Sequence, residues 1–388
     1  MNFDLTAEQE ALRQAVSELC MRFDERYWLE KEESHEFPWE FYSAVAEAGY
    51  IGVAIPEQYG GAGLGVLEAG LVLQEIAASG AGLNGCSAIH LSIFGMNPVV
   101  RHGSPELCAR YLPLVARGEL HVAFAVTEPD AGTDTTRITT FARREGDHYI
   151  VRGRKVWITK ALEAQKMLLL VRTTPRDQCG RRTDGMTLLL ADIDRRAVHV
   201  EPIAKMGRNA VDSNELFIDD LRVPVEDRVG EEGKGFYYLL DGLNAERILI
   251  AHEAVGLGQA ALRRAVKYAN ERIVFGRPIG QNQGVQFPLA RAWIALHAAE
   301  LVARRAAWLY DQGRPCGEEA NMAKFLAAEA AFFAADVAVQ THGGFGYAKE
   351  YHVERYFREA RLLRIVPISQ ELVLSYIGEH GLRLPRSY

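Results

Sequence analysis

Residues 121–134 read His-Val-Ala-Phe-Ala-Val-Thr-Glu-Pro-Asp-Ala-Gly-Thr-Asp, and the pattern of the chain changes at this stretch. Upstream of it, Thr6 and Gln9 form a capping-box pattern that predicts a helix start, and apolar residues then recur at helical spacing. Downstream, short β-branched or aromatic segments alternate with Gly, Asp and Pro, which is typical of antiparallel strands. The helical period returns after Gly230 and persists almost to the end of the chain.

These runs divide the chain into three predicted parts. We expect an α+β multidomain protein with an N-terminal all-α domain over residues 1–119, a middle antiparallel β-domain over 120–229 and a C-terminal helical domain over 230–388. Consecutive runs of one element type favour separate layers over an alternating βαβ sheet. Helices are predicted over 41–48, 67–78, 236–269, 287–311, 318–340 and 369–380, and strands over 121–126, 147–159, 167–173, 186–193 and 215–220.

Length and composition narrow the class of protein. A chain of 388 residues exceeds one ordinary core, which agrees with two or three domains. Its net charge of −7 argues against nucleic-acid binding and against an anionic membrane surface, because proteins of both kinds usually carry a basic excess. The longest purely apolar stretches, such as Met167–Val171, are far too short to span a bilayer. The N-terminus lacks the pattern of a secretion signal, and five scattered cysteines without a CxxC motif favour a reduced, cytoplasmic protein.

Several familiar motifs are absent or incomplete. The glycines of Gly61-Ala-Gly63-Leu-Gly65 lack full GxGxxG spacing and no βαβ unit surrounds them, so a turn between helices is favoured over a nicotinamide site. His252-Glu253 begins like a zincin motif, but no second histidine follows it. The eleven histidines show no ligand spacing, and no metal site is expected.

Two strand ends are candidates for a ligand site. Thr127, Thr133 and the backbone around Gly132 supply hydrogen-bond donors where a strand meets a loop, and a second strand ends at Val156–Thr159 with an indole and a hydroxyl. Such groups suit a flat aromatic ring with polar edges. Taken alone, ordinary turns around a buried tryptophan explain these segments better.

A set of motifs in a fixed order changes that balance. They are PEQYGGAG (56–63), AVTEPDAGTD (125–134), KVWIT (155–159), KMG followed by LFIDDLRVP (205–224), ERxxFGxxIxxxQ (271–283) and QTHGGFGY (340–347). Together they resemble the acyl-CoA dehydrogenase family over about residues 4–380. The resemblance implies that the C-terminal domain is a four-helix bundle and that FAD lies between it and the β-domain.

The resemblance also assigns residues to the cofactor. Gly132 and Thr133 would lie where the flavin phosphate and the substrate thioester approach. Planar guanidinium donors suit a pyrophosphate, and paired glycines let backbone N–H groups approach phosphate closely. The flavin ring would be lined by Phe124, Val126, Thr127, Trp157, Ile158 and Thr159; Arg272, Phe275 and Gln283 would reach the FAD of a neighbouring subunit; and Gln340, Gly343 and Gly344 would form an adenine and pyrophosphate loop that Ser369 and Glu371 close. A shared site implies a homo-oligomer, usually a homotetramer in this family.

Two positions depart from the family pattern. After Trp157 the family usually continues with Asn and then Gly or Ala, where this chain has Lys160-Ala161. Many members carry their catalytic base in a Tyr-Glu-Gly-Thr stretch, and here Pro367 occupies the place of that glutamate. Proline cannot accept a proton, so the base must lie elsewhere or the protein is inactive.

Glu246 is the candidate replacement. It falls in the apolar helical stripe of Leu239, Leu243, Ile250 and Leu257, where an acid is costly unless it is paired or functional. A glutamate at a helix edge or in a structural ion pair is the alternative explanation. The stretch Glu246-Arg247-Ile248 resembles isovaleryl- and long-chain-type members whose base precedes an arginine on this helix. Asn244 and Arg247 are then expected to contact substrate.

The implied reaction is α,β-desaturation of an acyl-CoA thioester, as in fatty acid metabolism by β-oxidation. Glu246 would remove the α-proton while the β-hydrogen leaves as hydride to the flavin, and electrons would pass to an electron-transferring flavoprotein. Two alternatives stay open: an oxygen-using relative, either an oxidase or a flavin monooxygenase, and a catalytically silent acyl-CoA-binding protein.

Overall fold

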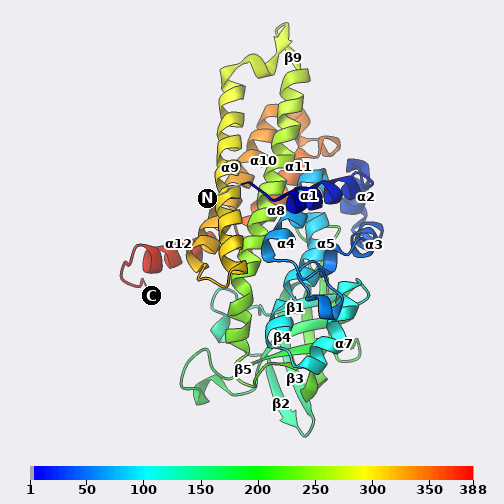
Figure 1. Ribbon diagram of the computed structural model, residues 1–388, viewed down its shortest axis with the longest axis vertical. Coiled ribbons are helices and arrows are strands. Elements are labelled where there is room, and N and C mark those ends of the chain that lie inside the picture. Colours follow the sequence, from blue (N-terminus) through cyan, green and yellow to red (C-terminus); the bar gives the residue numbers. More distant parts are fainter. Residues whose placement is uncertain (1–3, 388) are drawn as a thin grey trace.

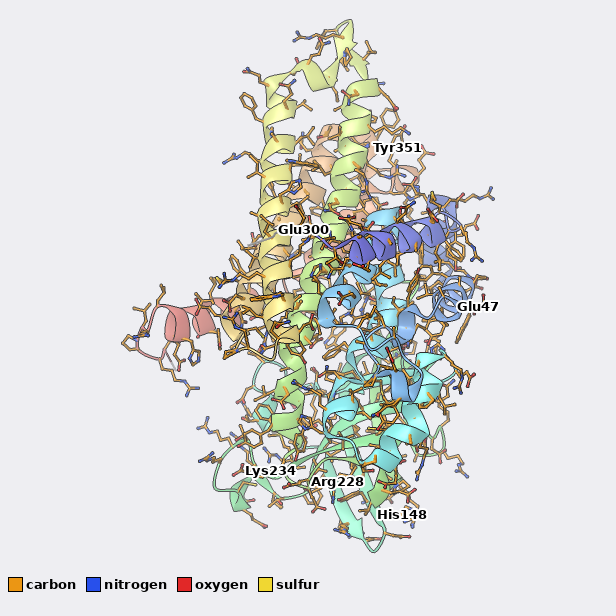
Figure 2. All side chains as sticks on the ribbon, in the orientation of Figure 1. Glu47, His148, Arg228, Lys234, Glu300 and Tyr351 are labelled. Atoms are coloured by element: carbon orange, nitrogen blue, oxygen red, sulfur yellow. The ribbon has the colours of Figure 1, made fainter. Side chains whose placement is uncertain are left out.

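The computed structural model describes residues 4–387 and is elongated, with the sheet at one end and long helices running to the other (Figure 1). Helices come first, strands follow and helices return, so the predicted three-part fold is confirmed. The predicted boundary at 119/120 falls between a helix and the first strand. The boundary at 229/230 falls between the last strand of the sheet and the longest helix, where Arg228 and Lys234 mark the junction (Figure 2).

The N-terminal helices pack around one apolar core. The Gln9 N–H donates to the Thr6 hydroxyl at 3.2 Å and the Thr6 N–H donates to the Gln9 side chain at 3.0 Å, so the predicted capping box is confirmed. These helices are α1 (Ala7–Cys20), α2 (Glu25–Ser34), α3 (Trp39–Glu47), α4 (Val66–Ile76), α5 (Gly82–Phe94), α6 (Asn97–His102) and α7 (Pro105–Ala116).

Within residues 4–387, one helical stretch, Val66–His102, passes a length and composition test for crossing a membrane. Of its most apolar window, 78% is buried inside the protein, which is the environment of a core helix. The stretch comprises α4, α5 and α6, and a π-helical segment, Ala77–Ala81, separates the first two. Gly80 in that segment has a φ of 108°, which favours glycine because other residues are strained there.

The middle part is a sheet in the order β6-β7-β3-β2-β4-β5-β8, with β1 added beside β4. Its pairings are antiparallel as predicted, with the correction that β1 and β2 run parallel to β4. β1 and β2 both pair with the edge of β4 that is opposite β5. Between them the chain leaves the sheet in a loop and returns as β2. The strands are β1 (Val122–Ala125), β2 (Phe141–Glu145), β3 (His148–Thr159), β4 (Lys166–Arg172), β5 (Met186–Asp192), β6 (Val198–Pro202), β7 (Ser213–Pro224) and β8 (Arg228–Val229).

The C-terminal part is the expected four-helix bundle. It consists of α8 (Gly235–Glu271), α9 (Gln283–Asp311), α10 (Gly317–His342) and α11 (Val353–Leu363). The 37 residues of α8 span about 55 Å at 1.5 Å per residue. A hairpin of β9 (Ile273–Val274) and β10 (Arg277–Pro278) caps the end of α8 that lies away from the sheet (Figure 1). A short helix, α12 (Gln370–Tyr376), projects sideways from the bundle (Figure 1).

Candidate active site

The ends of β1 and β3 lie side by side and carry the predicted flavin-lining residues. The Val156 N–H donates to the Thr127 carbonyl at 3.0 Å, which joins the two chain segments. The Trp157 side chain is 57% exposed although it is large and apolar, and its φ of 62° turns it out of the strand. Ile158 belongs to the buried apolar core of the sheet, and its carbonyl accepts from the Asn214 side chain at 3.0 Å, so its side chain is buried and its carbonyl is already bonded.

The loop between β1 and β2 carries Gly132 and Thr133, and both are exposed. A side chain added at Gly132 would meet no heavy atom within 4 Å, so open space adjoins this backbone. The N–H groups and hydroxyls of this loop and the exposed Trp157 indole are the groups that a planar ring with hydrogen-bonding edges would contact.

A buried ion pair anchors this loop to the sheet. The Lys155 ammonium lies 2.9 Å from a Glu128 carboxylate oxygen and donates to the Val126 carbonyl at 3.0 Å. The same carboxylate accepts from the Thr139 N–H at 2.7 Å, the Thr139 hydroxyl at 2.9 Å and the Thr140 N–H at 3.0 Å. The two ends of the 127–140 loop are thereby held together beneath Gly132. Burial lowers the pKa of Lys155 to about 8, and its charge is retained at neutral pH.

The departure at Lys160 leaves the flavin-lining residues free. Its ammonium donates to the Ala88 carbonyl at 3.1 Å and to the Ser92 hydroxyl at 3.2 Å, and both acceptors belong to α5. It also lies 5.3 Å from the ring centre of Tyr42. Lys160 therefore points away from Trp157 and ties the end of β3 to α5. Burial lowers the pKa of this lysine to about 7.

Glu246 lies on the part of α8 that faces α5. Phe94 of α5 is 3.7 Å from the point where a side chain at Gly242 would begin, and His90 of α5 is 2.7 Å from Glu253. These two contacts show that the helices run antiparallel, and they bracket Glu246 from both sides. The Phe94 ring also lies 5.2 Å from the ring of Phe124 on β1. Glu246 is thus one helical turn from a contact that leads directly to the strand ends.

The surroundings of Glu246 suit a proton acceptor. Its carboxyl is partly buried and makes no hydrogen bond to another described residue. Burial raises the pKa of Glu246 to about 7, against the opposing charges of His90 and Arg247 and with the charge of Glu253. The Arg247 guanidinium donates to the Asn244 side chain at 3.0 Å, so the two predicted substrate contacts lie together.

The segment around Pro367 is fixed near this end of the bundle. The Lys324 ammonium of α10 donates to the Ile368 carbonyl at 2.8 Å. Ser369 caps α12 by accepting from the Leu372 N–H at 3.2 Å. Within one chain, Ser369 and Glu371 do not lie at the Gln340 loop, because Lys324, which binds Ile368, precedes Gln340 by about 24 Å of helix. That they close this loop stays a prediction, and it requires a second chain.

The remaining predicted cofactor residues gather at the far tip of the molecule. The Arg272 guanidinium lies 5.8 Å from the ring centre of Phe345, so the end of α8 meets the Gly343–Tyr347 turn. Phe275 is fully exposed in the hairpin, and Gln283 begins α9 nearby. This tip stands about 50 Å along α8 from the sheet, judged by the helical rise. Within one chain, these residues and the ends of β1 and β3 are therefore too far apart to touch the same small ligand.

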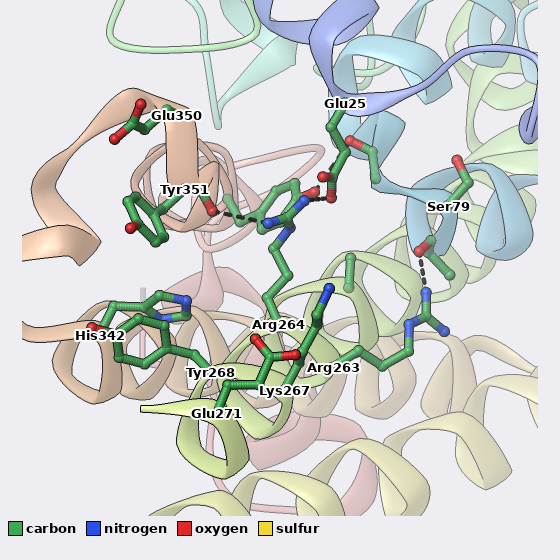
Figure 3. Close-up of a pocket in the computed structure, with 14 residues that line it drawn as sticks. Glu25, Ser79, Arg263, Arg264, Lys267, Tyr268, Glu271, His342, Glu350 and Tyr351 are labelled. Carbon is green, nitrogen blue, oxygen red and sulfur yellow. Dashed lines mark hydrogen bonds and ion pairs between the residues drawn. The ribbon is translucent and has the colours of Figure 1, made fainter. Parts of the chain in front are cut away.

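A cavity of about 470 Å³ opens beside the second half of α8 (Figure 3). Arg263, Arg264 and Lys267 line it together with Tyr268 and His342, whose rings are stacked. Arg264 forms an ion pair with Glu25, which also lines the cavity (Figure 3). The cavity begins at Ala260, about 21 Å along the helix from Glu246, and none of the predicted site residues lines it.

Family models match almost the entire chain. The N-terminal, middle and C-terminal domain models of acyl-CoA dehydrogenase match residues 6–119, 123–221 and 233–382. The chain belongs to the acyl-CoA dehydrogenase family. It is 40% identical over 389 residues to the acyl-CoA dehydrogenase fadE12 of Mycobacterium bovis, covering 100% of this chain and 99% of that one.

Solved structures agree with this membership. Butyryl-CoA dehydrogenase from Megasphaera elsdenii superimposes with a TM-score of 0.93 and 29% identity, over 99% of this chain and 100% of that one. An FAD complex of PigA superimposes with a TM-score of 0.93 and 25% identity, over 99% of this chain and 100% of that one. This acyl-CoA dehydrogenase is accordingly an FAD-dependent oxidoreductase acting on a CH–CH group.

Sequence reasoning missed several polar residues of this acyl-CoA dehydrogenase. Arg208 donates to the Ser87 hydroxyl at 3.1 Å and to the Thr159 hydroxyl at 3.3 Å, so a guanidinium lies beside a predicted flavin contact. His90 Nδ1 lies 2.7 Å from a Glu253 carboxylate oxygen, and both side chains are buried on the face of α8 that carries Glu246. The inward alternation of β3 contained a signal for Lys155, because it shares a face with Tyr149 and Val151. No sequence signal identified Arg208 or His90, whose partners come from distant segments.

Proposed function

We propose that this acyl-CoA dehydrogenase converts an acyl-CoA thioester to the trans-2-enoyl-CoA with Glu246 as the base. The observation that carries the proposal is an unbonded, partly buried carboxyl on α8, one turn from Gly242, which faces Phe94 of α5; the Phe94 ring in turn contacts Phe124 of β1. Its pKa, raised by burial to about 7, is close to neutral pH, and a general base is most effective when its pKa is near the working pH.

The chain supplies binding, orientation and the proton acceptor. When bound, FAD supplies the acceptor for the β-hydrogen. Glu246 takes the α-proton, a role that typically contributes about 10²–10⁴-fold to the rate. Holding the acyl chain between α8 and the ends of β1 and β3 aligns both carbon centres in one geometry. The residues proposed to hold the ring are those of the two strand ends, with Thr127 and Thr159 at its polar edges.

The thioester carbonyl needs hydrogen-bond donors, and Pro367 has no N–H to offer. We assign this role to the neighbouring Ile368 N–H, which donates to no described residue. Lys324 fixes the carbonyl of the same residue at 2.8 Å and so limits movement of the segment. Loss of an oxyanion donor costs about 2.7–4 kcal/mol in other enzymes, so a substitute is expected.

The cofactor site is proposed to be completed by a second copy of the chain. Arg272, Phe275 and Gln283 stand too far from their own sheet to reach the same ligand, which supports a contribution to a neighbouring FAD. A stripe of exposed apolar residues on α9 supports a homo-oligomer, proposed to be a tetramer, because large unpaired apolar faces mark interfaces. This stripe consists of Phe287, Ile294, Leu301 and Trp308, spaced seven residues apart.

The proposed acceptor of the electrons is an electron-transferring flavoprotein, and the proposed setting is β-oxidation in the cytoplasm. Five free cysteines, four of them buried, accord with a reducing compartment.

An anaerobic titration of the purified protein with straight and branched acyl-CoAs tests the proposal. Bleaching of the bound FAD by at least one acyl-CoA is expected, with slow reoxidation in air and fast reoxidation by an electron-transferring flavoprotein. Fast reoxidation in air would instead identify an oxygen-using relative. No bleaching by any acyl-CoA, in protein with full FAD content, would leave a silent acyl-CoA-binding protein.

A further inference from the structure

We propose that the buried ion pair between His90 and Glu253 is a positioning pair for the base. In this role, His90 holds a positive charge beside the Glu246 carboxyl and keeps it ready to accept a proton, while Glu253 keeps His90 charged. The inference rests on the proposed role of Glu246, and it adds two residues of α5 and α8 to the machinery of that site.

The crossing of α5 and α8 brings His90 to the face of α8 that carries Glu246 and Glu253. His90 Nδ1 lies 2.7 Å from Glu253 Oε1, and both side chains are more than nine-tenths buried. Glu246 and Glu253 are seven residues apart, so they share one face of α8 two turns from each other. Phe94 and His90 of α5 contact α8 at Gly242 and Glu253, so His90 contacts the face of α8 that also carries Glu246.

One ring nitrogen of His90 has no hydrogen-bond partner in the part of the chain that the structure describes. This nitrogen is Nε2, and it is buried. The Nε2 of His252 on α8 is likewise unpaired among the described residues, so the unpaired nitrogen alone does not distinguish His90. What distinguishes His90 is its place among the α5–α8 contacts at Gly242 and Glu253. Glu246 lies between the two α8 positions that contact α5, so Glu246 and His90 belong to the same interface between the two helices.

The charges around the pair agree with this role. Burial opposes a charge on His90, but the Glu253 carboxylate raises the pKa of His90, and Glu246 adds to that effect. Arg208, from the segment between β6 and β7, opposes it. The charged neighbours of Glu246 are His90 of α5 and, on its own helix, Arg247 and Glu253. His90 lowers the pKa of Glu246 by more than Glu253 raises it. The pair as a whole therefore favours the ionised, proton-accepting form of Glu246.

The test follows the protonation of Glu246 directly. Infrared difference titration of the FAD-loaded protein, without substrate, gives the midpoint at which the Glu246 carboxyl ionises, and loss of the band in Glu246→Gln assigns it. His90→Gln should raise that midpoint by at least about one pH unit, the lower end for loss of an opposite charge within reach. His90→Gln with Glu253→Gln should raise it by less, because the repulsion from Glu253 disappears as well. This double variant replaces an ion pair by two amides that can still bond, so it remains informative if the single variant does not fold.

His252→Gln is the matched control. His252 is a buried neighbour on the same helix, but its Nδ1 lies 2.9 Å from the Gln74 side chain of α4, on another side. Burial lowers its pKa to about 4, so it carries no charge at neutral pH. An unchanged Glu246 midpoint is expected in this variant.

Two results would overturn the inference: an unmoved midpoint in both His90 variants, or an equal movement in the His252 control. Because the titration needs no acyl-CoA, its outcome is separate from that of the bleaching experiment. A shifted midpoint in a protein that no acyl-CoA bleaches would refute the proposed reaction and leave the coupling of these three residues established.

Discussion

Replacing Glu128 by alanine should destabilise the β-domain and loosen the loop that carries Gly132. The change removes four hydrogen bonds, from the Thr139 N–H and hydroxyl, the Thr140 N–H and the Lys155 ammonium, at 2.7–3.0 Å. It also leaves Lys155, whose side chain is 0% exposed, without its counter-ion. Removal of one partner of a buried ion pair costs about 3–5 kcal/mol, and we expect a loss of that size.

Chemical denaturation of the FAD-loaded protein, at one fixed protein concentration, measures the loss, since assembly makes stability depend on concentration. Arg152→Ala is the matched control on the same strand as Lys155. Arg152 pairs with Asp220 at 2.6 Å, but the two side chains are 68% and 53% exposed, so its loss should cost no more than about 1 kcal/mol.

Lys155→Met gives a second comparison. It removes the buried ammonium and leaves the Glu128 carboxylate with its three donors from Thr139 and Thr140, so its cost should be smaller than that of Glu128→Ala. FAD content should fall in the order wild type, Lys155→Met, Glu128→Ala, because the loop is progressively less constrained. Equal costs for Glu128→Ala and Arg152→Ala would refute the reasoning that the buried pair anchors the loop.

Four further predictions concern Glu246, Arg272 and the N–H of Ile368. Glu246→Gln should slow flavin reduction at least about 10²-fold while FAD content is unchanged. The pKa of Glu246 is raised from 4.5 to about 7, so the stability contributed by its protonated form is lost as the pH rises through that window. Above pH 7, Glu246→Gln should therefore be more stable than the wild type by up to about 3 kcal/mol. Calorimetry at pH 5 and pH 8 checks the sign of this difference. Arg272→Ala should lose FAD and assembly together, and a variant that stays assembled with full FAD content, by size exclusion and absorbance, would contradict the shared site. Ile368→Pro should slow flavin reduction by about 10²–10³-fold if its N–H holds the thioester, whereas Ile368→Val should react like wild type in the same rapid-mixing experiment.

The long helices and central strands were predictable because their apolar residues follow simple periods. The helix over Phe236–Ala269 and the strand over 147–159 differ from α8 and β3 by one or two residues at their ends. Helix α11 was missed because its inward face includes Arg355 and Glu359, which pair with each other at 3.0 Å inside the core. Helix α5 was missed because it is buried on all sides, and a helix of that kind has no amphipathic period.

The residues of the candidate site were likewise predictable only where their signal lies within one helix or strand. Glu246 could be found from the sequence because a carboxyl interrupts an apolar stripe, and that signal lies within one helix. His90 and Glu253 are separated by 163 residues, and only the crossing of α5 and α8 brings them together. The expectation that Ser369 and Glu371 close the loop at Gln340 stays a prediction, since within one chain the Lys324 that binds Ile368 lies about 24 Å of helix before Gln340.

The length of α8 has a genetic consequence. Under the shared-site proposal, this one helix carries Glu246 for the active site of its own chain and Arg272 for that of a neighbouring chain. Each chain therefore contributes residues to two active sites. Two defective alleles, one encoding Glu246→Gln and the other Arg272→Ala, should then complement each other when expressed in the same cell. In a mixed pair of chains, one centre receives both defects and the other receives an intact Glu246 and an intact Arg272. Activity should reappear from two inactive parents, and selection on this helix acts on pairs of chains rather than on one.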